Sequence, residues 1–135
     1  MNISAVRAGI ATNANAIQGL NCYGYVPDSI SEPAFYAAEV DVNYDTSYGS
    51  LDELMVTCRV LVGRADDAAS QALLDDYLSR GDRSLKAAIE ADCTLGGACD
   101  DLRVQRVQGY RYYEHQNSKF IGAELVVQVI GTPEE

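Results

Sequence analysis

The sequence predicts one domain of mixed helices and strands, in the order helix, strand, strand, helix, helix, strand, strand. Two observations lead to this order. Apolar residues recur every three or four positions in three segments, as on one face of a helix, while four other segments carry the alternating or β-prone residues of strands. The length of 135 residues suits a single domain, 1–135, that can bury a core without metal or disulfide bonds.

The opening helix is predicted from a single apolar stripe, and Asn2 or Ser4 is available to cap its first turn. The stripe consists of Ile3, Val6, Ile10, Ala14, Ile17 and Leu20. Residues 21–33 follow, with a glycine and two prolines among them. We therefore expect a loop with turn-forming residues and no long periodic element there.

The next two elements are a predicted antiparallel hairpin. Residues 34–42 favour a strand, and residues 53–62 alternate between apolar positions and others. The long polar connection between them carries Tyr44, Asp45 and Tyr48. Exposed tyrosines contribute most when a partner desolvates them, so we interpret this tip as a contact with a neighbouring protein. A merely solvated loop is the alternative.

Two helices are predicted next, one over residues 66–80 and a short one that begins at Asp82 or Ser84. The first helix carries four acids: Asp66, Asp67, Asp75 and Asp76. Asp66 and Asp75 are nine residues apart, which is two and a half helical turns, so they project from opposite faces. We expect a solvated helix surface there, not a metal site.

The last two elements, residues 100–113 and 119–131, form a second predicted hairpin. In the first of these strands the apolar alternation slips after Val107. In the second, Val126 and Ile130 make the opposite face partly apolar as well. A strand that is apolar on both faces is either interior to its sheet or covered by a partner subunit. Val126 and Ile130 are therefore candidate interaction residues.

The formal net charge of −10 argues against nucleic-acid binding and against attachment to a membrane surface, because the ten basic residues form no run. No stretch of eighteen apolar residues is present, and residues 1–20 are too polar for a secretory signal. We expect assembly in a cytoplasm. The acidity fits either simple solubility or a task beside DNA that must slide past without sticking.

No catalytic, cofactor or metal site is predicted. His115 is the sole histidine and has no nucleophile or carboxylate at motif spacing, and no phosphate-binding, dinucleotide-binding or hydrolase motif occurs. The four cysteines lack zinc spacing. Cys93 and Cys99 flank a short turn, and whether they pair is left open. We therefore expect a protein that is not an enzyme and carries no cofactor.

The order of the elements resembles the tail terminator proteins of long-tailed bacteriophages. The resemblance covers almost the whole chain and is carried by the opening helix with NCYGYVPDSISEPAFYAAEVDVNYD, then by VTCRVLVGRADDAASQALLDDYLS, GDRSLKAAIEAD, LRVQRVQGYRYYE and KFIGAELVVQVIG. It implies an α+β subunit with a mostly antiparallel four-stranded sheet backed by helices. Such subunits close into a homohexameric ring.

The same resemblance implies a virion protein at the head-proximal end of the tail. It would stop polymerisation of the major tail tube protein and join the tail to the head connector or stopper protein. DNA would pass through its lumen without specific binding, with Asp66, Asp67, Asp75 and Asp76 as candidate lumen acids. The alternatives are another head-to-tail joining or tube protein, such as a stopper, adaptor or tube subunit, or a small ligand-binding domain.

Overall fold

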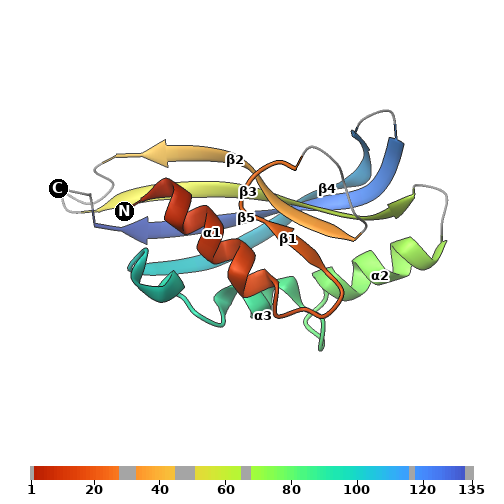
Figure 1. Ribbon diagram of the computed structural model, residues 1–135, viewed down its shortest axis with the longest axis horizontal. Helices are drawn as coiled ribbons and strands as arrows, with labels where there is room; N and C mark the ends of the chain where they lie inside the picture. The colour runs from red at the N-terminus through yellow and green to blue at the C-terminus, as the bar shows by residue number, and fades with distance from the viewer. Residues whose placement is uncertain (1, 28–32, 45–50, 65–67, 116–117, 133–135) are drawn as a thin grey trace.

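A computed structural model describes residues 2–27, 33–44, 51–64, 68–115 and 118–132. In these residues three α-helices and one short 3-10 turn accompany a single five-stranded sheet, so the fold is α+β (Figure 1). The helices are α1 (Ile3–Ala14), α2 (Ala68–Leu78) and α3 (Leu85–Glu90). The strands are β1 (Asn21–Tyr23), β2 (Ala34–Asn43), β3 (Asp52–Arg64), β4 (Asp101–His115) and β5 (Ser118–Gly131).

The sheet is mixed and has five strands, so the prediction of four antiparallel strands is wrong at one edge. The strand β1 lies where the sequence predicts a loop, and it pairs in parallel with the first three residues of β2. Three residues are too few to show an alternation. This strand is defined by its distant partner, since the Asn21 N–H donates to the Pro33 carbonyl at 3.0 Å.

Both predicted hairpins are confirmed as antiparallel strand pairs, β2 with β3 and β4 with β5. A third antiparallel pairing, β3 with β5, joins them in the order β1-β2-β3-β5-β4. The strand β4 has register shifts between Val104 and Arg106 and between Gln108 and Arg111. An extra residue in one strand reverses the side on which the following side chains lie. These bulges account for the slip in the apolar alternation of β4.

All three helices pack against one face of the sheet. Side chains from α1, α2 and α3 share one core cluster with alternate residues of the strands, including Val56, Val60, Leu125 and Val127. Figure 1 shows α1 in front of the sheet, with α2 and α3 along its lower side. None of the helices in the described residues is long and apolar enough to cross a membrane.

The helices α1 and α3 begin at the expected caps, and α1 is shorter than predicted. The Asn2 side chain accepts a hydrogen bond from the Ala5 N–H at 3.0 Å, and Ser84 Oγ accepts one from the Ala87 N–H at 3.2 Å. The helix α1 ends at Ala14, although Ile17 and Leu20 beyond it are still buried. Apolar spacing alone therefore overestimates the helix, because buried turn residues continue the stripe.

The opposite face of the sheet carries no helix in the described residues, and we call it the helix-free face. Its own small core consists of Tyr36, Leu61, Tyr113 and Phe120. The strand β5 lies between β3 and β4 and is buried on both faces. An interior position therefore explains its two apolar faces, which is the first of the two explanations that the sequence left open.

Candidate assembly surfaces

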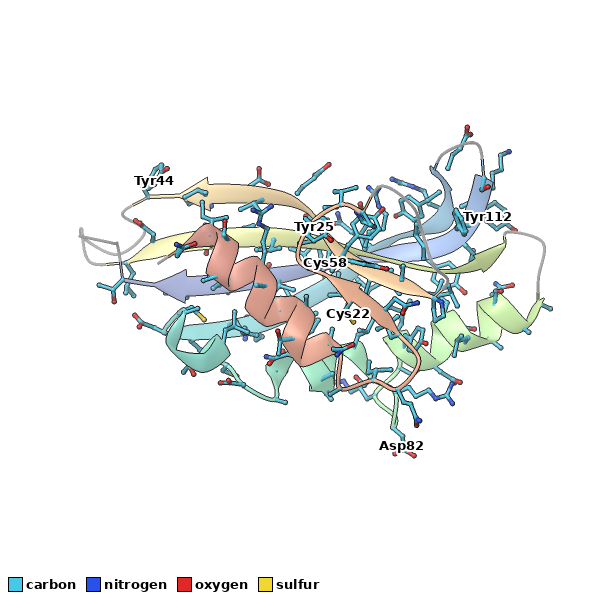
Figure 2. All side chains as sticks on the ribbon, viewed as in Figure 1. Cys22, Tyr25, Tyr44, Cys58, Asp82 and Tyr112 are labelled. Atoms are coloured by element: carbon cyan, nitrogen blue, oxygen red, sulfur yellow. The ribbon has the colours of Figure 1, made fainter. Side chains whose placement is uncertain are left out.

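Exposed apolar side chains gather at the two edges of the sheet. Of the seven large hydrophobic residues that are exposed in the described part of the chain, only Ile3 lies on a helix. Three belong to the β1–β2 edge: Tyr25, Val26 and Tyr44. The other three belong to β4: Val107, Tyr110 and Tyr112. Figure 2 shows Tyr44 and Tyr112 near opposite ends of the long axis of the molecule.

We call one of these surfaces the acidic edge, and it consists of Tyr25, Val26, Glu39, Asp41 and Tyr44. The pairing of β1 with β2 stops at Tyr36, so the outer side of β2 beyond it has no strand partner in the described residues. Glu39 and Asp41 are exposed there, opposite Thr57 and Met55 of β3. Tyr44 follows β2 and is 74% exposed.

The arginine edge consists of Arg103, Arg106, Val107, Tyr110 and Tyr112. The strand β4 is the opposite edge of the sheet, and both arginines are exposed. Arg106 Nε donates to Gln108 Oε1 at 3.1 Å. The edge therefore presents positive charge next to exposed aromatic rings.

The hydroxyl of Tyr110 fastens β4 to the helix α2. It donates to Asp75 Oδ1 at 2.7 Å. Desolvation and this bond to a carboxylate both raise the pKa of Tyr110 above its usual value. The bond places Asp75 beside the arginine edge.

The backbone of β4 is already occupied at Val104. Glu90 Oε2 accepts a hydrogen bond from the Val104 N–H at 2.9 Å, and Lys86 Nζ donates to the Val104 carbonyl at 3.3 Å. Lys86 and Glu90 also pair with each other at 2.6 Å. Partial desolvation opposes ionisation of Glu90, but the bonds from Lys86 and Val104 outweigh it and lower the pKa of this carboxyl. An added strand would have to displace both side chains here.

The middle of the helix-free face is held by a charged pair. Arg59 Nη2 lies 2.8 Å from Glu124 Oε2, and the Arg59 guanidinium stacks over the Tyr113 ring at 4.6 Å from its centroid. Desolvation opposes the charge on Arg59, yet its bonds to Glu124 and Tyr36 raise its pKa further. Arginine is charged at any physiological pH, so the pair is structural.

A cavity of about 320 Å³ lies between α2, α3 and β4. Apolar side chains such as Leu78, Val107 and Leu125 line it. Four cations also line it: Arg80, Lys86, Arg103 and Arg106. In a protein with ten excess acids, this is a local concentration of positive charge.

The predicted contact residues differ in how exposed they are in the structure. Tyr44 is exposed, while Asp45 and Tyr48 lie outside the described residues. Val126 is only 3% exposed and is flanked by Thr57 and Arg106, and Ile130 is half-buried. Little of Val126 is therefore available to a partner.

The candidate lumen acids are only partly described. Asp75 and Asp76 are exposed on α2. Asp66 and Asp67 lie outside the described residues.

The four cysteines are free thiols. Cys93 Sγ donates to the Glu90 carbonyl at 3.2 Å and Cys99 Sγ to the Cys93 carbonyl at 3.3 Å, so the two do not pair with each other. Burial raises the pKa of Cys22 to about 11 and that of Cys58 to about 12. Thiols of such high pKa are poor nucleophiles at neutral pH.

Sequence reasoning missed Glu39, Asp41, Arg103 and Arg106 as a group. Their common feature is an exposed charge on an edge strand, which the sequence shows only after the strand order is known. No family model matches this chain, and no curated protein matches it.

Proposed function

We propose that this chain is a structural subunit of a bacteriophage tail. In this role it forms a homohexameric ring, caps the head-proximal end of the tail tube and stops its polymerisation. The single observation that carries the proposal is the gathering of exposed apolar side chains at two separate sheet edges. A subunit that joins one edge to a different edge of the next copy makes a heterologous contact, and such contacts form a ring when the rotation between copies closes and an open filament when it does not.

The position of the ring within the tail is proposed from the resemblance of the sequence to tail terminator proteins. One ring face would meet the major tail tube protein, and the other would meet the head connector or stopper protein. The net charge of −10 supports an open lumen, because excess acids repel a polyanion and leave passing DNA few sites to bind. Asp66, Asp67, Asp75 and Asp76 are the candidate lumen acids.

Two measurements test the role. Light scattering and negative-stain microscopy of the purified protein should show rings at micromolar concentration. Adding the protein to polymerising tube protein should then give tubes that stop growing at the capped end. A protein that stays monomeric both alone and in assembled tails contradicts the proposal.

A ring with no effect on tube length would favour a stopper, an adaptor or a tube subunit.

A small ligand-binding domain is the second candidate, and the cavity beside β4 favours it. Its volume of about 320 Å³ is at the lower end of the range for ligand sites, and its four cations suit an anion with an apolar body. Calorimetric titration with simple aromatic carboxylates tests this reading. Saturable binding by a protein that never forms rings would establish it over the ring.

A further inference from the structure

Two neighbouring rows of side chains cross the helix-free face from one sheet edge to the other. The first row runs from Glu39 through Thr57 and Val126 to Arg106. The second runs from Asp41 through Met55 and Gln128 to Arg103. Each row begins with an exposed acid on β2 and ends with an exposed arginine on β4.

The strand directions allow both rows to continue into another copy together. The strand β2 is antiparallel to β3, β3 to β5 and β5 to β4, so β2 and β4 run in opposite directions. A neighbour placed beside β4 in the same orientation would present its β2 as an antiparallel partner. Its Glu39 would then continue the row that ends at Arg106, and its Asp41 the row that ends at Arg103.

We infer that the arginine edge of one copy docks against the acidic edge of the next, with Arg106 facing Glu39 and Arg103 facing Asp41 of the neighbouring copy. The inference rests on the proposed ring and names the surfaces that close it. The occupant of each edge is a second copy of this chain. Two acids and two arginines match in register on the outer side of β4 and on the outer side of β2 beyond Tyr36, and neither of these has a strand partner in the described residues.

The Val104 N–H and carbonyl already bind Glu90 and Lys86. At this position the neighbouring copy is therefore contacted through side chains and not through backbone hydrogen bonds. Exposed ion pairs are weak individually. The charges therefore determine which edges pair, and the apolar residues contribute most of the binding free energy. The exposed apolar residues are Tyr25, Val26 and Tyr44 on one edge and Val107, Tyr110 and Tyr112 on the other.

The same charges disfavour the two-fold alternatives. Two arginine edges brought together would oppose arginine to arginine, and two acidic edges would oppose acid to acid. Only unlike edges attract, which is the head-to-tail order that a ring requires. Charges on edge strands also protect proteins against strand addition, and the experiment must separate that role from docking.

A charge-swap experiment distinguishes docking between copies from protection of the edge strands. One variant carries R103E and R106E, and a second carries E39K and D41K. At low salt each alone should need about a tenfold higher concentration for assembly than the wild type, since both contacts become repulsive. Single reversals of Asp82 and Arg83, which are exposed on the turn between α2 and α3, are the matched controls and should assemble normally.

Mixing the two variants in equal amounts is the decisive step. The acidic β4 of the first variant then faces the basic β2 of the second, and the basic β4 of the second faces the acidic β2 of the first. Alternating rings should form at close to the wild-type concentration, as seen by light scattering and native mass spectrometry. Edge protection predicts no such rescue, and neither does loss of an anion from the cavity.

The outcomes separate this inference from the function it rests on. Rings from each variant alone, or no rescue on mixing, would overturn the edge pairing and leave the ring itself standing. A wild-type protein that forms no ring alone or on tubes would overturn both. Circular dichroism and melting temperatures of the variants, measured beside the wild type, show that any lost assembly is not lost folding.

Discussion

Arg59 Nη2 and Glu124 Oε2 lie 2.8 Å apart at the centre of the helix-free face, where each side chain is largely shielded from water. The pair joins β3 to β5 and supports the Tyr113 ring beneath the guanidinium. It therefore ties together the two hairpins of the sheet.

Replacing Glu124 with Ala should lower the free energy of unfolding by about 2 kcal/mol, because a charged hydrogen-bond acceptor is removed from a half-buried guanidinium. Urea unfolding followed by circular dichroism measures the change. Glu114, which is exposed on β4, provides the control, and Glu114→Ala should cost under about 0.5 kcal/mol. Equal losses for the two variants would mean that the Arg59 pair contributes nothing.

The lowered pKa of Glu90 predicts a loss of stability in acid. A carboxyl whose pKa is lower in the folded state stabilises the fold above its unfolded pKa, and this contribution disappears as the pH falls through the folded pKa. Glu90→Gln should lose about 0.5–1 kcal/mol at neutral pH. Its melting temperature should then approach that of the wild type below the usual glutamate pKa of about 4.3. A constant difference from pH 7 to pH 3 would contradict the assignment.

Gly122 of β5 has no room for a side chain. A Cβ there would lie 2.8 Å from Leu61 Cδ2 and would clash with the Val60 carbonyl oxygen, which is backbone and cannot move aside. Gly122→Ala should therefore destabilise the fold by about 1–3 kcal/mol. Gly81→Ala is the control, since nothing lies within 4 Å of its Cβ position, and it should be neutral. Urea midpoints compare the two, and a neutral Gly122→Ala would show that β3 shifts.

The exposed tyrosines at the two edges should matter for assembly and not for folding. Tyr44 is 74% exposed and Tyr112 60%, so Tyr44→Ser and Tyr112→Ser should leave the melting temperature within about 2 °C of the wild type. Both should weaken ring formation, because desolvated tyrosines contribute strongly to interfaces. Light scattering over a dilution series measures this effect. Unchanged assembly would show that both side chains remain exposed to solvent in the ring and make no contact between copies.

Reversing the candidate lumen acids tests the passage of DNA. If Asp66, Asp67 and Asp76 face the hole, their joint replacement by Lys should create DNA binding that weakens steeply with salt, since screening acts within about 8 Å at physiological ionic strength. Fluorescence anisotropy with a labelled duplex detects it, and Asp82→Lys is the control. Rings of the triple variant that bind no DNA at low salt would place these acids on the outside.

The sequence predicts the two hairpins, the three helices and the caps of α1 and α3 because these depend on local spacing. It does not predict β1, which exists only through its parallel pairing with β2. The sequence also does not predict the arginine edge, for a different reason. Arg103 and Arg106 are three residues apart, so strict alternation puts them on opposite faces of a strand. The bulge between Val104 and Arg106 brings both to the helix-free face, and the slip in the apolar alternation does not show where along β4 that bulge lies.

The interior position of β5 has a consequence for synthesis. The strands β3 and β4 emerge from the ribosome before residues 118–131 and cannot become neighbours of their common partner until that segment is free. The sheet therefore closes only after translation has passed β5, and a nascent chain stalled earlier exposes the apolar faces of β3 and β4. Truncation within β5 should accordingly yield insoluble protein, not a smaller folded domain.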